Sequence, residues 1–194
     1  MTTALTINDH DALLLVDVQN DFCPGGALAV TDGDAVIAPL NRLGARFALV
    51  AATRDLHPPD HCSFVTRGGP WPVHCVAGSP GAAYHGELDI SRVTLHVSKA
   101  AEPEVEAYDG FAGTPDLAAE LRARGIERVF VGGLATDYCV LHTVLSARRA
   151  GFAVVVVTDA VRAVEARPGG NARALAEMAA AGAVLATSAE IVGE

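Results

Sequence analysis

Two imidazoles and two carboxylates stand within the segment DLHPPDH, residues 55–61. The paired prolines at its centre oppose a regular helix or strand, so these side chains are expected on loop backbone. Asp55, His57 and His61 supply one oxygen and two nitrogens. With the later His74 they form a ligand mix that Zn, Fe or Mn accepts, although any one loop histidine taken alone is more often a solvent-facing residue. The set favours one bound divalent metal ion with positions left for water or substrate.

Three further residues carry the groups that nucleophilic acyl transfer requires. Cys139 follows the glycine pair of GGLATDYCV and opens a helical pattern, where free amides and the helix dipole would lower the pKa of its thiol and receive an oxyanion. Lys99 is the only lysine among the 14 Lys and Arg residues, and its compact ammonium suits acid–base or oxyanion chemistry. Asp17 ends an apolar run, where a buried carboxylate needs a cation or donor.

Each of these residues also has a structural interpretation without chemistry. Cys139 could be a small buried hydrophobe, because free cysteines usually only pack. Lys99 could be a lysine without a special role, left by chance in a composition that prefers arginine. Asp17 could cap a turn at the end of a strand. Their combination is what favours a catalytic site over three unrelated structural roles.

Alternating apolar runs and amphipathic stretches must position these residues. The runs are nearly continuous in apolar character, which is typical of strands covered on both faces. They predict strands at residues 12–18, 47–53, 93–98, 128–134, 153–160 and 183–188, with helices near 33–45, 115–125, 137–150 and 170–182. The predicted fold class is α/β, a doubly wound, mostly parallel six-stranded sheet with helices on both faces.

In such a sheet, ligands bind beyond the carboxyl ends of the strands, near a point where the strand order reverses. Asp17 closes the first predicted strand and Asp55 follows the second. Lys99 follows the third strand, and Cys139 comes just after the fourth. We therefore expect all four side chains to converge at one edge of the sheet.

Residues 54–92 form the one long connection between predicted elements. The segment holds five of the ten prolines, four histidines and the sole tryptophan, Trp71. A connection of this length inside a compact domain is normally functional or disordered. Its metal-binding and aromatic residues favour a metal- and substrate-binding loop.

Length and composition restrict the class of protein. With 51% hydrophobic residues and a mean hydropathy of +0.30, the chain is expected to fold as a single domain over residues 1–194. The formal net charge of -9 argues against a nucleic-acid partner. The sequence lacks a basic signal region and an apolar run of about 18 residues, and its cysteines show no disulfide framework. We expect a soluble, cytoplasmic protein without membrane attachment that binds a small molecule; the oligomeric state, including a homo-oligomer, stays open.

Four segments resemble the nicotinamidase, or pyrazinamidase, branch of the isochorismatase-like cysteine hydrolases. They are VDVQNDFCPGGALAV, TRDLHPPDHCSF, WPVHCVAGSPGA and GLATDYCVLHTV, and the resemblance runs in order from about residue 12 to residue 185. It implies an isochorismatase-like fold and an amidohydrolase that converts nicotinamide, and also pyrazinamide, to the acid and ammonia. A role in NAD salvage, which supplies pyridine nucleotides, is implied as well.

The resemblance also implies roles for individual residues. The implied catalytic triad is Asp17, Lys99 and Cys139. The implied metal ligands are Asp55, His57, His61 and His74. The backbone amides of Ala135 and Cys139 are implied as the oxyanion hole, after a cis peptide between Leu134 and Ala135. Phe22 and Trp71 are implied to sandwich the pyridine ring, with Tyr108 lining the pocket.

Two departures from the family pattern leave questions open. The segment from Asp55 to His61 is compact compared with some relatives, so His61 could be repositioned or a water could take its place. Lys99 is followed by Ala100 and an acidic run, residues 102–106, where many relatives continue with glycine and polar residues. The range of substrates is therefore open.

Other functions compete with nicotinamide hydrolysis. A cysteine amidohydrolase of the same superfamily could act on another small amide, such as a carbamoyl or maleamate-type compound, although such relatives generally lack the full metal set. A non-catalytic metal- or ligand-binding module could keep the pocket without turnover. A vinyl ether hydrolase of the isochorismatase type is disfavoured, because that branch typically lacks the thiol that Cys139 provides.

Overall fold

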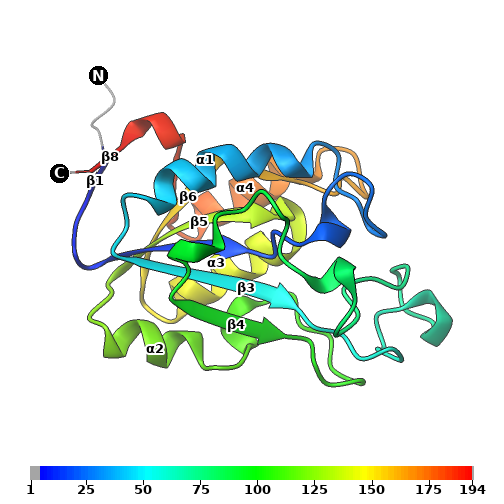
Figure 1. The fold of residues 1–194 in the computed structure, drawn as a ribbon. Coiled ribbons are helices and arrows are strands. Elements are labelled where there is room, and N and C mark those ends of the chain that lie inside the picture. Colours follow the sequence, from blue (N-terminus) through cyan, green and yellow to red (C-terminus); the bar gives the residue numbers. More distant parts are fainter. Residues whose placement is uncertain (1–4, 194) are drawn as a thin grey trace.

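The computed structural model describes residues 5–193 and is built on a six-stranded parallel sheet (Figure 1). The strand order is β4-β3-β2-β5-β6-β7, and each neighbouring pair is parallel. The strands are β2 (Asp11–Val16), β3 (Leu49–Asp55), β4 (Leu95–Lys99), β5 (Arg128–Leu134), β6 (Ala153–Arg162) and β7 (Val184–Ala186). The predicted α/β class and the six-stranded sheet are confirmed. The ends of the expected domain, residues 1–4 and 194, lie outside the described residues.

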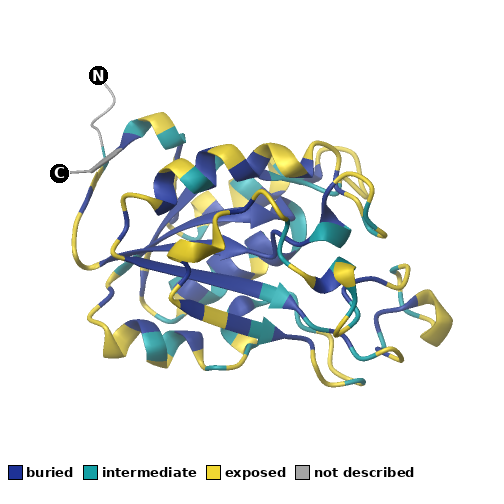
Figure 2. Ribbon diagram, viewed as in Figure 1, coloured by how far each residue is buried: buried dark blue, intermediate teal, exposed yellow. Residues whose placement is uncertain are grey.

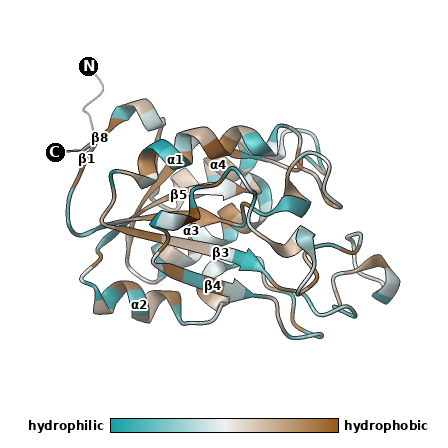
Figure 3. Ribbon diagram, in the orientation of Figure 1, coloured by the Kyte–Doolittle hydropathy of each residue, from teal (hydrophilic) through white to brown (hydrophobic). Residues whose placement is uncertain are grey.

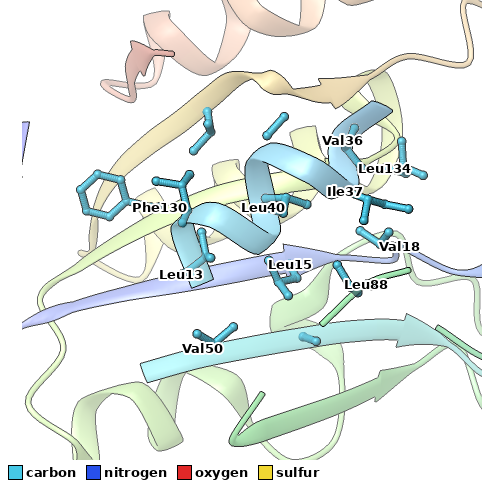
Figure 4. Packing of buried hydrophobic residues seen from close by; sticks show 14 of the residues in the cluster. Leu13, Leu15, Val18, Val36, Ile37, Leu40, Val50, Leu88, Phe130 and Leu134 are labelled. Atoms are coloured by element: carbon cyan, nitrogen blue, oxygen red, sulfur yellow. The ribbon is translucent and has the colours of Figure 1, made fainter. Parts of the chain in front are cut away.

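Helices cover both faces of the sheet, as the sequence predicted. They are α1 (Ile37–Gly44), α2 (Leu117–Ala123), α3 (Leu141–Arg149) and α4 (Gly170–Ala180). Successive residues of a strand point to opposite faces, so Leu13 and Leu15 pack with Leu40 of α1 (Figure 4). Leu14 and Val16 belong to the opposite core, which α2, α3 and α4 cover. This division leaves β2 buried along its whole length.

Burial follows the hydropathy of the sequence. The central strands of the large sheet are mostly dark blue in Figure 2, and the edge strand β4 has a yellow section; the outward faces of the helices and many loop residues are yellow. Figure 3 shows the hydropathy changing to hydrophilic at the arrowhead of β3, the end that carries Asp55. None of the helices within residues 5–193 combines the length and apolar character that crossing a bilayer requires.

The boundaries of several elements differ from the sequence-based prediction. The helix predicted near 33–45 begins with a 3-10 turn, Gly33–Val36, and the one near 137–150 begins with a π-helical turn, Thr136–Val140. A second, two-stranded parallel sheet pairs β1 (Leu5–Ile7) with β8 (Ile191–Gly193). The sequence did not predict this sheet, because three residues are too few to show a strand period.

The first part of the long connection lies beyond the carboxyl ends of the strands, and its last part runs back to the start of β4 (Figure 1). Residues 56–94 contain three short 3-10 turns, Val65–Arg67, Pro80–Ala82 and Ile90–Arg92, in place of a longer helix or a strand of the sheet. Isolated bridges fold the segment onto itself, and Phe64 and Cys75 are fully buried. The segment therefore has a small core of its own. This core holds the side chains of the segment in place without a longer helix or a strand of the sheet.

The strand order reverses between β2 and β5, which are neighbours in the sheet. Gly133 of β5 has a φ of +127°, and a Cβ added there would lie 2.0 Å from the carbonyl oxygen of Val16. Only glycine allows the two strands to approach this closely at their ends. The chain then continues into Asp17 on one side of the reversal and into the turn that carries Cys139 on the other.

Candidate active site

The side chains of Asp17, Lys99 and Cys139 meet beyond the ends of β2, β4 and β5. The Nζ atom of Lys99 lies 2.9 Å from Oδ2 of Asp17 and 3.5 Å from Sγ of Cys139. A carboxylate oxygen of Asp17 lies within 4.8 Å of the same sulfur. All three residues are buried. The convergence of these side chains on one sheet edge, which the strand ends predicted, is confirmed.

Asp17 is held in place by Thr53 of the neighbouring strand β3. Its backbone adopts a left-handed conformation with a φ of 49°, and its amide donates to the carbonyl of Thr53. The hydroxyl of Thr53 donates to Oδ1 of Asp17 over 2.6 Å. The other oxygen, Oδ2, lies within ion-pair distance of the Lys99 ammonium, but it accepts no well-directed hydrogen bond among the described residues. Oδ2 is therefore the oxygen that can accept a proton.

Lys99 lies between two carboxylates. Besides Asp17, its ammonium contacts Oδ1 of Asp55 at 2.5 Å and donates to the carbonyl of Ala107 over 3.1 Å. Burial alone would lower the pKa of Lys99, but the two carboxylates outweigh it and raise this pKa well above its ordinary 10.5. Lys99 is therefore a permanent cation at the centre of the site.

The two carboxylates respond in opposite directions. Burial raises the pKa of Asp17 above its ordinary 3.8, although Lys99 and the hydroxyl of Thr53 both act to lower it. Burial also acts to raise the pKa of Asp55, but Lys99 and His57 overcome it and hold that pKa below its usual range. Asp55 is thus the permanent anion that pairs with Lys99, and Asp17 is the carboxylate poised to exchange a proton.

The predicted lowering of the Cys139 pKa is wrong. Burial raises the pKa of this thiol well above its ordinary 9.0, and the negative charges of Asp17 and Asp55 add to the effect while Lys99 opposes it. The sequence suggested a helix start with free amides, but the cysteine lies in a π-helical turn and is only 5% exposed. Cys139 therefore rests as a neutral thiol and needs a base before it can attack.

Three of the four predicted metal ligands come together. One ligand atom from each of Asp55, His57 and His74 lies within 4.8 Å of the others, and all three residues are buried. The Nδ1 atoms of His57 and His74 contact the carbonyls of Ala100 and Pro72, at 3.2 and 2.7 Å. A carbonyl only accepts, so these contacts place the proton on Nδ1 and the lone pair on Nε2.

The donor atoms fit a divalent cation. Nε2 of His57 is buried, lies 3.7 Å from Oδ2 of Asp55 and has no hydrogen-bond partner within the described part of the chain. Burial lowers the pKa of His74, which keeps this imidazole neutral, the form that binds metals. A buried lone pair without a partner is costly, and a metal ion would satisfy it.

His61 lies beside this set without joining it. Its ring centroid is 4.2 Å from that of His57. Both of its nitrogens are engaged, Nδ1 with the hydroxyl of Ser63 at 2.7 Å and Nε2 with the carbonyl of Val105 at 3.0 Å. In this structure His61 therefore contacts Ser63 and Val105 and is not grouped with Asp55, His57 and His74.

A small pocket opens onto the sulfur of Cys139. Phe22, Trp71 and Tyr108 line it as predicted, and the indole of Trp71 donates to the hydroxyl of Tyr108 over 2.9 Å. Ala135 and Cys139 lie in the same wall, and the peptide between Leu134 and Ala135 is cis. The complete lining is Phe22, Leu28, Asp55, Trp71, His74, Tyr108, Ala135, Tyr138, Cys139 and Val164.

Sequence reasoning missed several residues of this site. Leu28, Tyr138 and Val164 line the pocket; the first two stand inside segments already singled out, and the third follows the end of a strand. Asp137 was also missed, and its carboxylate accepts from the amides of Val164 and Glu165 at 2.9 and 3.0 Å. The available signal was that Asp137 stands two residues before Cys139. Its partner Val164, however, lies 27 residues further along the chain.

Comparisons with known proteins find similar chains and structures. The family model described as "Isochorismatase domain" matches residues 11–190. The nicotinamidase of Escherichia coli (strain K12) is 41% identical over 203 residues, covering 92% of this chain and 95% of the relative.

Two solved structures are also similar. PnC1 from L. infantum, in complex with nicotinate, has a TM-score of 0.93 and 39% identity, and the match covers 98% of this chain and 100% of the other. The pyrazinamidase of Pyrococcus horikoshii, in complex with zinc, has a TM-score of 0.86 and 46% identity, covering 92% and 99%.

Proposed function

Because the chain belongs to the isochorismatase family and is an amidohydrolase of its nicotinamidase branch, we propose that it hydrolyses nicotinamide to nicotinate and ammonia through a thioester on Cys139. Pyrazinamide is a second expected substrate. The observation that carries the proposal is that the thiol of Cys139, in the lining of an aromatic pocket, lies beside the buried carboxylate of Asp17 and the buried ammonium of Lys99. The nicotinate bound to the similar L. infantum protein supports a pyridine ring in this pocket.

Aromatic side chains select the substrate ring. Phe22 and Trp71 present flat apolar surfaces, and such surfaces stack favourably with a planar heteroaromatic ring. Tyr108 is held by its hydrogen bond from Trp71, so it fixes the size of the pocket on that side. A planar amide on a six-membered ring can then place its carbonyl carbon beside the sulfur of Cys139.

Acylation begins with a proton transfer from the thiol to Asp17. Oδ2 of Asp17 takes the proton of Cys139 as the sulfur forms a bond to the carboxamide carbon, so no free thiolate accumulates in the resting enzyme. The electron pair of the carbonyl moves onto oxygen. The amides of Ala135 and Cys139 receive this oxyanion, with the ammonium of Lys99 nearby.

Ammonia leaves when the tetrahedral carbon collapses. Protonated Asp17 gives its proton to the amide nitrogen, the carbon–nitrogen bond breaks, and the acyl group remains on Cys139 as a thioester. Water then attacks the thioester carbon while Asp17 takes a proton from it. The carbon–sulfur bond breaks, the sulfur regains the proton, and nicotinate leaves. Lys99 stays charged throughout and keeps Asp17 oriented.

A divalent cation belongs to the proposed site. Asp55, His57 and His74 would hold it, and His61 would join them by exchanging its contact with Val105 for the ion. When bound, the ion supplies a Lewis acid that can anchor the ring nitrogen and order water. The zinc in the similar Pyrococcus horikoshii pyrazinamidase supports such a site, and zinc, iron and manganese all suit these donors.

Ammonia release from nicotinamide by the purified protein tests the proposal. The parent should produce equal amounts of ammonia and nicotinate, and Cys139→Ala should produce neither. Cys62→Ala is the matched control, because this cysteine lies outside the pocket lining and should leave turnover intact. A panel with pyrazinamide, a carbamoyl compound and maleamate separates the alternatives. Higher catalytic efficiency on either of the last two would replace the proposed substrate, and no turnover on any amide would indicate a binding module.

A further inference from the structure

Gln19 is a fully buried polar residue that the reaction described above does not use. It lies just past the end of β2, two residues after Asp17, inside the segment VDVQNDF. A buried amide normally has all its hydrogen-bonding groups satisfied, so the partners of Gln19 indicate what it holds.

All the partners of this side chain are backbone groups. Oε1 accepts from the amide of Asp55 over 2.8 Å, and Nε2 donates to the carbonyl of the same residue, also over 2.8 Å. Nε2 donates a second time, to the carbonyl of Ala82 over 2.9 Å. The side-chain amide therefore bonds both the backbone N–H and the backbone carbonyl of Asp55, as a neighbouring strand would.

The position of this pair explains the need for it. The last backbone contact between β2 and β3 is the amide of Asp17 with the carbonyl of Thr53, after which β2 turns away at its left-handed residue. Asp55 is two residues further along β3 and would otherwise lack a partner on that side. Its other side is paired with Lys99 of β4. The amide of Gln19 thus replaces the missing residue of β2.

Asp55 is also where the two halves of the site join. Its Oδ1 contacts Lys99 at 2.5 Å and its Oδ2 lies 3.7 Å from Nε2 of His57. Its backbone determines where both oxygens point. We propose that Gln19 is a positioning residue that sets the Asp55 carboxylate between the ammonium and the imidazoles. The inference rests on the proposed metal-dependent hydrolysis and adds a residue outside the implied triad and ligand set.

The test compares zinc(II) affinity and steady-state kinetics in the parent, Gln19→Met and Gln19→Glu. Gln19→Met keeps the length of the side chain and removes every hydrogen bond; Gln19→Glu keeps the acceptor for the Asp55 amide and serves if the first variant fails to fold. In Gln19→Met we expect zinc affinity, measured by chelator competition, to fall about 10- to 100-fold. The kcat should fall with it, because a smaller fraction of the protein carries zinc at a limiting zinc concentration, while the zinc-loaded fraction keeps its KM within about twofold. Gln19→Glu should move both quantities in the same direction by less.

Asn20→Ala is the matched control. The side-chain Nδ2 of Asn20 donates to the carbonyl of Pro80 over 2.8 Å, so the side chain of Asn20 anchors the same segment as Gln19 without touching Asp55. It should leave zinc affinity and kcat unchanged. Equal losses in Asn20→Ala, or Gln19 variants with parental zinc affinity and kcat and only a lower Tm, would overturn the positioning role. A parent that neither binds zinc nor hydrolyses nicotinamide would instead refute the proposed function itself.

Discussion

The proposed catalytic groups and the proposed metal-binding groups of this protein stand on two different kinds of backbone. Asp17, Lys99 and Cys139 come from the ends of parallel strands or the turn that follows one, so the register of the sheet fixes their spacing. His57, His61 and His74 come from the irregular connection between β3 and β4. Their rings are oriented by contacts to backbone carbonyls and a serine hydroxyl.

The two regions also differ in how complete they are. Around Lys99, two carboxylates and a carbonyl surround the ammonium, whose single positive charge offsets part of the negative charge of the two carboxylates. Among the imidazoles, Nε2 of His57 has no partner in the described chain, and His61 is turned to Val105. A sheet edge can therefore present a preformed reacting centre, whereas the loop presents donors that a ligand must still draw together.

Loss of the proton acceptor should produce the largest change, because it affects the preformed region. Asp17→Asn should lower kcat by about 10²- to 10⁴-fold, since a neutral amide cannot take the thiol proton. The fold should persist, because asparagine keeps an oxygen for the hydroxyl of Thr53. Ammonia release and circular dichroism measure the two effects. An active, folded Asp17→Asn protein would remove Asp17 from the reaction.

The histidines of the loop should contribute unequally to zinc affinity, because only some of their rings are already oriented for a metal ion. His57→Ala should weaken zinc binding by about 100-fold or more, because an oriented ligand is lost. His61→Ala should cost about tenfold or less, because recruiting His61 first breaks its contact with Val105, which offsets part of the gain. Chelator competition and elemental analysis of the purified variants measure both. Equal losses in the two variants would show that the loop is as preformed as the sheet edge.

Activity should follow the protonation of Asp17 on the acid side. Its raised pKa means that kcat/KM should fall about tenfold per pH unit below a midpoint that lies above 3.8. No alkaline loss is expected from Cys139 or Lys99 up to pH 9.0, since both pKa values are raised well above that. A pH profile of kcat/KM on nicotinamide tests this. A rate that keeps rising towards pH 9.0 would mean that a preformed thiolate is the nucleophile.

The smallest effect is expected at the aromatic wall. Tyr108→Phe removes the acceptor for the indole of Trp71, a single hydrogen bond worth about 1 kcal/mol, which corresponds to roughly a fivefold rise in KM. The kcat should stay near the parental value, because Tyr108 does not touch Asp17, the proposed acceptor of the Cys139 proton. Steady-state kinetics on nicotinamide separate the two constants. A large loss of kcat with unchanged KM would give Tyr108 a role in the reaction itself.

The sequence predicted the sheet edge better than the loop, for physical reasons. Apolar runs locate strands, and parallel strands must place their carboxyl ends together, so Asp17, Lys99 and Cys139 could be expected to meet. The direction of the His61 ring could not be predicted, because it depends on a carbonyl 44 residues away. The raised pKa of Cys139 was missed because burial in a site depends on packing that residue types do not reveal.

Gln19 shows a further limit of sequence reasoning. Glutamine has no distinctive chemistry, and nothing in VDVQNDF indicates that its side chain would stand in for a strand residue. That role exists only because β2 turns away from the sheet while β3 continues to Asp55. The segment was identified correctly, but the reason for one of its residues required the three-dimensional structure.

The central claim is that Cys139 carries the acyl group during turnover. Mass spectrometry of the protein, quenched with acid during hydrolysis of nicotinamide and then digested, tests it most directly. We predict a nicotinoyl group on the peptide that contains Cys139 in the parent and no such group in Cys139→Ala. The modified peptide should be more abundant when hydrolysis of the thioester is slowed. Continued ammonia release by Cys139→Ala, with no acyl group on any peptide, would contradict the account.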